Sequence, residues 1–508
     1  MATLRDVARL ARVSTMTVSR VVNNSRDVKS ETRAHVQSAI AQLGFVPNAL
    51  GRLLAQKKVR ASPARSGTVS DGNDFREKNR VNADDQLSFQ APSQRPEPAP
   101  QRATIPVGDT ARAILRIVRA AQPISRVDLA RRLEVNRSTV TVMVTPLIAS
   151  GVLREAAPEQ RAASRRGRPP IGLSLRGDKS FVIGVNIGVR RTQVGAATTD
   201  GRMLDEESFD TPADPNGALA RINSIMSRLR ESTTERALIS IAVSVPGPTD
   251  AGRKQLLFAP HLGWRDVPVA ETLSAGDNRS ARVSDRSVSV IVENDATAAA
   301  MYEARRRLRA SAHKVQNDFI LVRAGTGIGV GLVLGGEVYR GTGTDRGLLG
   351  EFGHMTIVAD GKACACGNRG CWEVYASAAS AASAYVGEGT STRAGTPPRF
   401  IEIVARAEAG ERRAQAALAR TGKSLGIGIG NVITGLGVSQ VVVSGRIVHG
   451  WKFLQKSIED AVAGTMAGRL SNWSVERGEP TGAGLGGALE VAFEHYFTGL
   501  AKLTPAAA

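Results

Sequence analysis

The chain has 508 residues, of which 42% are apolar and 22% charged, a globular composition with room for three or four domains. No stretch approaches about 18 uninterrupted apolar residues and the first residues hold no apolar run, which excludes a membrane span and a secretory signal peptide. The three cysteines all lie between positions 364 and 371, which excludes a disulfide scaffold and favours a metal site. These features predict a multidomain cytoplasmic protein with no membrane partner.

The net charge of +20 is concentrated on two short segments. Residues 1–60 contain 11 basic and 3 acidic residues, and residues 107–176 contain 13 basic and 5 acidic ones. Such clustering is typical of polyanion binding. The first 176 residues contain no Trp or Tyr that could stack on unpaired bases, so double-stranded DNA is the favoured partner. For the charge alone, a merely solubilising basic surface is the alternative.

Residues 1–58 are predicted to form a small all-α domain of capped helices. Ser14 is placed to cap a second helix over 15–23, and Ser30 to cap a third helix that ends at Gly44. In a helix-turn-helix, side chains early in the second helix reach base edges in the major groove. The candidates for this role are Thr15, Met16, Thr17, Ser19 and Arg20.

The run from Thr3 to Ala49, including Val13-Ser14-Thr15-Met16-Thr17-Val18-Ser19-Arg20 and Gly44-Phe45-Val46-Pro47-Asn48, closely resembles the helix-turn-helix headpiece of the lactose-repressor (LacI) family. The resemblance implies a hinge helix over 48–56, with Leu54 as a wedge in the minor groove. The effector domain of that family does not follow the hinge. A headpiece without a DNA role, left as a fusion remnant, is the alternative interpretation.

Residues 59–106 are rich in Pro, Ser, Gln and Arg and have no apolar periodicity, so we expect a disordered linker. A flexible linker of this length has an r.m.s. reach of about 35–40 Å, roughly one turn of duplex DNA. The two basic segments could therefore bind one DNA site or two.

Residues 107–176 show the order of a winged helix: three helices and then a β-wing. Ser125 is placed to cap a helix over 126–133 and Asn136 a recognition helix from 137 to 148, in which Pro146 removes a backbone hydrogen bond and predicts a kink. A basic loop over 161–168 and an extended piece over 170–175 follow. A basic helical spacer is the alternative.

The motifs Ser125-Arg126-Val127-Asp128-Leu129-Ala130, Asn136-Arg137-Ser138-Thr139-Val140-Thr141 and Gly167-Arg168-Pro169-Pro170 resemble the winged helix that precedes the sugar-kinase-like domain in repressors of the ROK family (repressor, open reading frame, kinase). The resemblance implies that Arg137, Ser138, Thr139 and Thr141 face the major groove. Arg168 near the wing is expected to contact phosphates or the minor groove.

Residues 177–508 have a glycine-rich α/β pattern. Strands are predicted over 181–186, 193–198, 203–209, 239–245, 287–292, 319–324, 329–334 and 440–443, with an amphipathic helix over 216–230. The ROK resemblance implies a two-lobed actin/hexokinase-like fold for this segment.

A metal site is predicted from His354, Cys364, Cys366 and Cys371. Three thiolates and one imidazole satisfy tetrahedral zinc with no open position, and Gly367 and Gly370 allow the chain to turn between the ligands. The arrangement also matches the zinc signature of the ROK family. A closed site indicates a structural zinc and not a hydrolytic one.

A sugar site is implied by the ROK resemblance at five positions: Asn294, Asp295, Glu351, His354 and Glu373. Convergent carboxylates, amides and imidazoles are the groups that hold polyols, and a zinc-bound His354 would turn its other ring nitrogen to the ligand. Asp295 corresponds to the general base of a kinase. A vestigial pocket is the alternative.

The nucleotide side departs from the family's kinases. Gly325-Thr326-Gly327-Ile328-Gly329 resembles their second phosphate loop, but the first loop, Asp-x-Gly-x-Thr in kinases, reads Asn186-Ile187-Gly188-Val189-Arg190. Loss of the carboxylate and the hydroxyl predicts that ATP is not a cofactor and that phosphoryl transfer is lost. The leading hypothesis is a sugar-controlled, dimeric DNA-binding repressor of carbohydrate-metabolism genes. The rival hypothesis is a sugar kinase with accessory DNA-binding domains.

Overall fold

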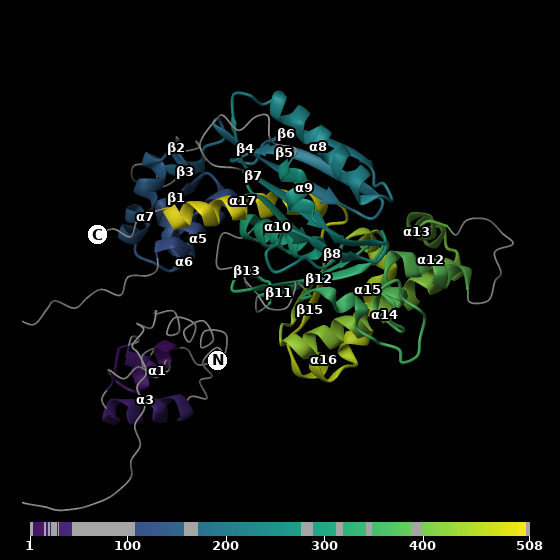
Figure 1. The fold of residues 1–508 in the computed structure, drawn as a ribbon. Helices are drawn as coiled ribbons and strands as arrows, with labels where there is room; N and C mark the ends of the chain where they lie inside the picture. Colours follow the sequence, from purple (N-terminus) through teal and green to yellow (C-terminus); the bar gives the residue numbers. More distant parts are fainter. Residues whose placement is uncertain are drawn as a thin grey trace, which may run out of the picture. The chain divides into compact units, whose positions relative to one another are not determined.

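The computed structural model describes residues 4–14, 17–18, 21, 28, 30–42, 107–156, 171–275, 288–310, 318–341, 348–387 and 398–503 (Figure 1). The chain divides into two compact units, Met1–Pro98 and Ala99–Ala508, each of which is treated by itself. The linker predicted over 59–106 and the hinge helix predicted over 48–56 lie outside the described residues.

The first unit contains α1 (Leu4–Leu10) and α3 (Ser30–Gln42), with Thr17, Val18 and Val21 also helical. The side chain of Ser14 accepts a hydrogen bond from the Thr17 amide at 3.1 Å, which confirms Ser14 as a cap of the second helix. A small core joins the three helical pieces through the buried residues Val7, Ala8, Val18, Val21, Val36 and Ala39.

The second unit begins with a winged helix. Its elements are α5 (Val107–Ala121), β1 (Ile124–Ser125), α6 (Arg126–Leu133), α7 (Arg137–Ala149), β2 (Leu153–Ala156) and β3 (Gly172–Leu175), and the strands form an antiparallel sheet in the order β1-β3-β2. The Ser125 hydroxyl accepts from the Asp128 amide at 3.1 Å, which confirms the predicted cap of α6. α7 continues through Pro146 and ends three residues later.

The first lobe is built on a five-stranded sheet in the order β10-β7-β4-β5-β6. The strands are β4 (Ser180–Ile187), β5 (Arg191–Thr198), β6 (Met203–Asp210), β7 (Ala237–Val245) and β10 (Val290–Asn294). β4, β5 and β6 form the predicted antiparallel meander, while β7 pairs in parallel with both β4 and β10. α8 (Pro215–Glu231) and α9 (Val269–Ala275) contribute to the core on one face of this sheet, beside a small hairpin of β8 (Leu256–Ala259) and β9 (Trp264–Val267).

The second lobe is built on a five-stranded sheet in the order β13-β12-β11-β14-β15. The strands are β11 (Phe319–Ala324), β12 (Ile328–Leu334), β13 (Glu337–Tyr339), β14 (Gln440–Ser444) and β15 (Ser474–Arg477). One face packs on a helical layer that includes α12 (Ala378–Val386), α13 (Phe400–Glu408), α14 (Arg412–Leu436) and α15 (Trp451–Ala463), followed along the chain by α16 (Met466–Leu470). The other face, with Phe319, Leu321 and Val442, packs on α10 (Asp295–Ala310).

The winged helix and the first lobe share one hydrophobic core. Buried Leu115 and Val118 of α5 belong to the same cluster as Leu489, Phe493 and Phe497 of α17 (Ala483–Leu503). Figure 1 shows α17, in yellow, running from the β4–β7 sheet to α5. Truncating one such aromatic side chain to alanine typically costs about 3–5 kcal/mol, so this contact holds the winged helix firmly on the lobe.

A glycine makes room for the same contact. Gly201 has φ +99°, and a Cβ placed on it would lie 2.0 Å from the Arg119 Nη1 of α5. Beside it, the Gln122 amide donates to the Asp200 carbonyl at 2.7 Å. Among the described residues, no helix is long and apolar enough to cross a bilayer.

Candidate ligand cleft, metal group and DNA-facing helix

The first candidate ligand residues lie where β10 meets α10. The Asn294 side chain accepts from the Ala296 and Thr297 amides at 2.9 and 3.1 Å, and so caps α10. Its amide nitrogen donates at 3.2 Å to the Glu351 carboxylate. Asn294 is 5% exposed, so it acts within the protein by fixing the first turn of α10 and the orientation of Glu351.

Glu351 and His354 come from the short helix η1 (Glu351–His354), and Glu373 opens α11 (Glu373–Ala376). The structure brings these residues together with Asp295: burial, followed by the charges of Asp295 and Glu373, raises the pKa of Glu351 to about 8. His354 turns Nε2 toward Glu351 Oε2 at 3.8 Å. The five residues predicted from the sequence therefore form one polar cluster.

Glu373 is held by two further contacts. Its Oε2 accepts from the Ile328 amide at 2.9 Å, and its Oε1 lies 2.9 Å from His261 Nε2. The hydrogen bond to Glu373 raises the pKa of His261, against the opposing effect of burial. Sequence reasoning missed His261, which lies in the turn between β8 and β9, because nothing in its local pattern marks it as a ligand residue.

Three residues bear on the phosphate side that the sequence predicts. The Asn186 amide that replaces the kinase carboxylate is already engaged: Ser244 Oγ donates to it at 2.9 Å and it donates to Gln193 Oε1 at 3.2 Å. Arg190 is exposed in the turn between β4 and β5. Arg323 of β11 forms an ion pair with Asp295, the candidate base. This ion pair engages a carboxylate that a kinase needs free to accept a proton.

The phosphate loop itself keeps a compact turn between β11 and β12, in which the Gly325 amide donates to the Gly327 carbonyl at 2.9 Å. Arg446, the first residue of η2 (Arg446–Gly450), donates to Thr326 Oγ1 at 2.7 Å. Sequence reasoning missed the contact of Arg323 with Asp295 and that of Arg446 with Thr326.

The predicted metal ligands converge. The ligand atoms of His354, Cys364, Cys366 and Cys371 lie within 4.8 Å of one another. His354 Nδ1 is 3.6 Å from Cys364 Sγ, and the Sγ atoms of Cys366 and Cys371 are 3.8 Å apart. Zinc–sulfur bonds of about 2.3 Å place tetrahedral sulfur ligands about 3.8 Å apart, so the spacing fits a zinc ion.

The chain turns around this group as the glycines predict. Gly367 and Gly370 have φ +96° and +73°, and a Cβ on Gly370 would lie 1.8 Å from the Val358 carbonyl. Trp372, fully buried, donates to the Ser424 carbonyl of α14 at 2.9 Å and anchors the metal group to the second lobe. His354 therefore turns Nδ1 toward the cysteine sulfurs of the metal group and Nε2 toward Glu351.

The candidate DNA-facing helix is α7. Arg137, Ser138 and Thr141 are exposed and Thr139 is half-buried, whereas Val140 is buried in the shared core. Val142, which sequence reasoning missed, is 65% exposed on the same helix, and exposed apolar side chains in the major groove contact thymine methyl groups.

Most other predicted DNA contacts are outside the described residues. These are Thr15, Met16, Ser19, Arg20, Leu54 and Arg168. Thr17 is described: its hydroxyl lies 2.9 Å from the Ser14 hydroxyl.

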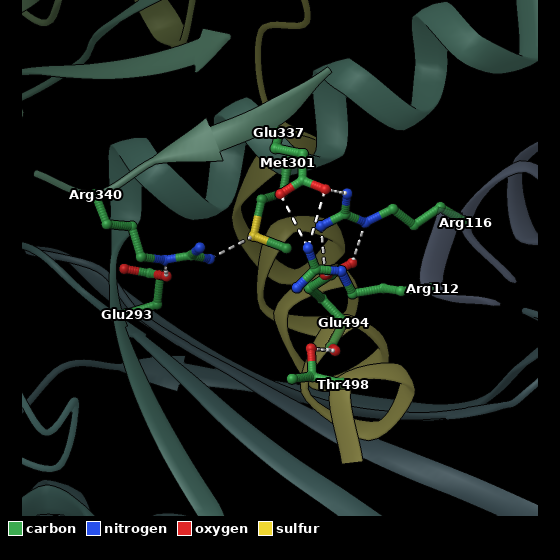
Figure 2. A network of polar contacts seen from close by, with 8 residues as sticks. All are labelled: Arg112, Arg116, Glu293, Met301, Glu337, Arg340, Glu494 and Thr498. Atoms are coloured by element: carbon green, nitrogen blue, oxygen red, sulfur yellow. Dashed lines mark hydrogen bonds and ion pairs between the residues drawn. The ribbon is translucent and has the colours of Figure 1, made fainter. Parts of the chain in front are cut away.

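An ion-pair network joins α5 to both lobes (Figure 2). Arg116 donates from Nε to Glu494 of α17 and from Nη1 to Glu337 of β13, each at 2.6 Å. Arg112 also donates to both Glu337 oxygens at 3.1 Å. Although burial opposes it, the charges of Arg116 and Arg112 lower the pKa of Glu337. This network, named the α5 clamp, consists of Arg112, Arg116, Glu337 and Glu494.

Further polar contacts extend from β13 toward the ligand cluster. Arg340, which follows β13, donates at 2.8 Å to Glu293, the residue before Asn294, and contacts the Met301 sulfur at 3.4 Å (Figure 2). Arg253 donates to the same Glu293 oxygen at 2.8 Å. The strand that contacts the winged helix therefore also leads to a residue adjoining the ligand cluster.

Comparison with known proteins gives a family model for each part. The ROK family model matches residues 182–494, more than half of the chain. The chain belongs to the ROK family. The model for bacterial regulatory proteins of the lacI family matches residues 3–48, and a winged helix-turn-helix DNA-binding model matches residues 109–154.

Among curated relatives, the xylose repressor of Bacillus spizizenii is 28% identical over 364 residues, which cover 71% of this chain and 88% of that protein. The glucokinase of Streptomyces coelicolor is 32% identical over 197 residues, 39% of this chain and 56% of that protein. A crystal structure of a ROK family transcriptional regulator, described as a homologue of the E. coli MLC protein, matches with a TM-score of 0.61 and 23% identity, over 78% of this chain and 98% of that one. That likeness supports the fold: helix-turn-helix segments followed by an actin/hexokinase-like ROK domain.

Proposed function

We propose that this ROK family protein is a transcriptional repressor of carbohydrate-metabolism genes, and that a sugar bound between its two lobes controls its affinity for operator DNA. The observation that carries the proposal is the α5 clamp, because it joins the DNA-binding helix bundle to both lobes that border the cleft. The match to the xylose repressor over 71% of the chain supports the same assignment.

In this proposal, Asp295, Glu351, His354 and Glu373 contact the sugar hydroxyls, and Asn294 positions Glu351. Arg116 bridges α17, which packs on the first sheet, and β13, the edge strand of the second sheet. A sugar that favours one lobe arrangement changes these ion pairs by its differential affinity for the two arrangements. Such coupling between two sites is typically worth about 1–3 kcal/mol.

The metal group fits structural zinc in this scheme. Zinc supplies a fixed coordination centre, and the four protein ligands leave no open position for catalysis. His354 would be held by its Nδ1, so that its Nε2 stays directed at the sugar.

The rival function, an ATP-dependent sugar kinase, is opposed by the phosphate side. Asn186 is an amide engaged by its neighbours, Arg190 replaces a hydroxyl, and Arg323 is paired with Asp295. In a coupled-enzyme assay with Mg-ATP and a panel of hexoses, we expect no turnover. Sustained ADP release that disappears in Asp295→Ala would establish the kinase instead.

The DNA-binding part is tested by mapping binding sites of the full chain across its genome and measuring duplex affinity by fluorescence anisotropy, with and without sugars. Arg137→Ala should weaken operator binding about tenfold, the loss expected for one good base contact. The matched control is Arg309→Ala, on the exposed end of α10. Absence of affinity for any duplex at moderate salt would refute the proposal.

Footprinting with and without residues 1–60 tests whether both DNA-binding segments are used. We expect the footprint to shorten without them, because the lacI family model matches the first segment and a winged helix-turn-helix DNA-binding model matches the second. An unchanged footprint would leave operator binding to the winged helix alone. A homodimer, the state that two-fold half-sites require, is the expected result of sedimentation analysis.

A further inference from the structure

A pocket lies where α5, α10, α17 and β13 meet. Its empty space, including the part open to solvent, is about 550 Å³, within the range of about 300–1,000 Å³ that is usual for small-ligand sites. Figure 2 shows four of its lining residues, Arg116, Met301, Arg340 and Glu494. None of the five residues of the sugar cluster, all of which the structure describes, lines this pocket, so a ligand here would occupy a second site.

Part of the lining is apolar and comes from three elements. Leu308 belongs to α10, Val338 to β13 and Phe497 to α17, and these three residues are named the apolar wall. Leu308 and Val338 are half-buried and Phe497 is 1% exposed, so the wall is held in place by the surrounding core. A wall of this kind favours a ligand with an apolar body.

Two arginines of the lining share one carboxylate. Arg119 of α5 and Arg305 of α10 both donate to the same oxygen of Glu490, Oε1. Arg119 is 5% exposed, and among the described residues its Nε has no hydrogen-bond acceptor, nor has the Nε of Arg305. Burial lowers the pKa of Arg119 to about 10 and the charge of Arg305 acts in the same direction, while Glu490 and Asp200 oppose them. The positive charge at this end of the pocket is therefore incompletely balanced, which favours an anion.

Arg340 supplies donors that an anion could engage. Its Nε donates to Glu293, but its Nη2 has the Met301 sulfur as acceptor, at 3.4 Å, and a thioether is a weak acceptor. Met301 and Arg305 are four residues apart on α10 and so lie one turn apart on the same face. The side chains of Arg340 and Arg305 are 35% and 27% exposed, so both reach the open side of the pocket. A carboxylate placed between them would accept charge-assisted hydrogen bonds.

We propose that this pocket is a second effector site for a small organic carboxylate, whose charged group lies between Arg305 and Arg340 and whose body packs on the apolar wall. A carboxylate carries one negative charge and matches the two guanidinium groups that share Glu490 better than a phosphate monoester of charge about −1.5 to −2. Because the lining comes from α5, α17 and both sides of β13, the bound acid favours the arrangement in which the α5 clamp is formed. Binding is independent of the sugar site, whereas the effect on operator DNA rests on the proposed function.

The test is calorimetric binding to the full chain with three carboxylates and their neutral amides: hexanoate and hexanamide, benzoate and benzamide, phenylacetate and phenylacetamide. In at least one pair we expect the acid to bind about tenfold tighter than the amide, the gain of one charge-assisted contact. Acetate, which has the charged group without the body, should bind at least about tenfold more weakly than that acid. Added salt should weaken the acid and leave the amide nearly unaffected.

Variants assign the binding to the pocket. Arg305→Gln should weaken the acid about tenfold and leave the amide unchanged. Ala304→Leu, which enlarges another lining residue without altering charge, should weaken acid and amide alike by about tenfold. Arg309→Gln, exposed at the end of α10, is the matched control and should keep both affinities. Thermal unfolding of each variant checks that it is folded.

The effector role is tested with operator DNA in the absence of sugar. A saturating concentration of the tightest acid should change the operator dissociation constant about threefold or more in the parent chain. The same concentration should change it much less in Ala304→Leu, because that variant no longer binds the acid well.

Each failure refers to a different claim. Equal affinities within every pair, absence of binding by every acid, or an affinity that survives both Arg305→Gln and Ala304→Leu would overturn the site. Tighter binding of phenyl phosphate than of benzoate would overturn the assignment to a carboxylate. Binding of the acid without a change in operator affinity would overturn the effector role. None of these results bears on the sugar site, whose own tests use sugars without added carboxylate.

Discussion

The two ends of the cleft differ in how far they keep what a kinase needs. At the proposed sugar end, the five residues that the resemblance implies, Asn294, Asp295, Glu351, His354 and Glu373, are all present, and hydrogen bonds or charge interactions link them into one cluster. At the phosphate end, Asn186 and Arg190 depart from that pattern, and Arg323 occupies the candidate base.

This difference between the two ends distinguishes recognition of a polyol from phosphoryl transfer. Recognition of a polyol needs only fixed donors and acceptors, which the α10 cap and the metal group supply. Phosphoryl transfer also needs a metal-bound phosphate and a free base in line with it. On the proposed function, this chain has lost the second set and kept the first, so that it binds a sugar without phosphorylating it.

Removing the metal should have the largest effect on the sugar end. Cys371→Ala takes away one of four ligands, so we expect the zinc content, measured by mass spectrometry, to fall from about one ion per chain to none. Sugar affinity should fall about a hundredfold because His354 loses its anchor. Arg369→Ala, an exposed residue between the ligands, is the control and should keep the metal. A variant without zinc that still binds sugar normally would contradict the role assigned to the metal group.

Asp295→Asn should weaken sugar binding about tenfold, since a charged acceptor becomes a neutral amide. The sugar affinity is measured by isothermal titration calorimetry, with the sugar that releases operator DNA. Asp460→Asn, on the exposed face of α15, should leave the affinity as it is. If Asp295→Asn bound sugar as well as the parent chain, Asp295 would belong to the altered end of the cleft and not to the sugar end.

Arg116→Gln should uncouple sugar binding from operator binding. The variant loses ion pairs to Glu337 and Glu494 together, so the change in operator affinity on adding sugar should shrink about fivefold. The measurement is the ratio of operator dissociation constants with and without sugar. Arg309→Gln is the control. A ratio equal to that of the parent chain would show that the coupling runs elsewhere.

The smallest effect concerns pH. The folded-state pKa of His261 is raised by Glu373, so its contribution to stability is full below the unfolded value of about 6.5 and is lost as pH rises through the folded pKa. Urea unfolding of the parent chain and His261→Gln should differ by up to about 1 kcal/mol near pH 6 and by less near pH 8.5. His449→Gln, exposed in η2, serves as control. A difference that grows with pH would reverse the assigned sign.

Much of the fold follows from local pattern. The buried run Phe319–Ala324 and the meander from Ser180 to Asp210 were predicted because their apolar content and turns suffice, and Ser14 and Ser125 cap helices as their positions indicate. The metal group was predictable for a similar reason: its three thiols are close in sequence, and His354 is only ten residues away.

The missed residues depend on contacts between distant segments. β13 has three residues and no usable periodicity, yet its Glu337 pairs with Arg116 across 221 positions. Arg323 points at Asp295 because odd-numbered residues of β11 face α10, and the sequence shows the alternation but not which face meets that helix. His261 likewise gains its partner only when the lobes are assembled.

Because α5 packs on α17, the order in which the two helices are translated has a consequence for biosynthesis. The ribosome makes α17 more than 360 residues after α5, an interval of roughly 20–70 s at ordinary translation rates. During that time the apolar side of α5 that later contacts Phe493 has no permanent cover. Nascent chains should therefore need chaperone protection at this surface, and a repressor able to hold its operator in the regulated geometry should arise only once α17 has been translated.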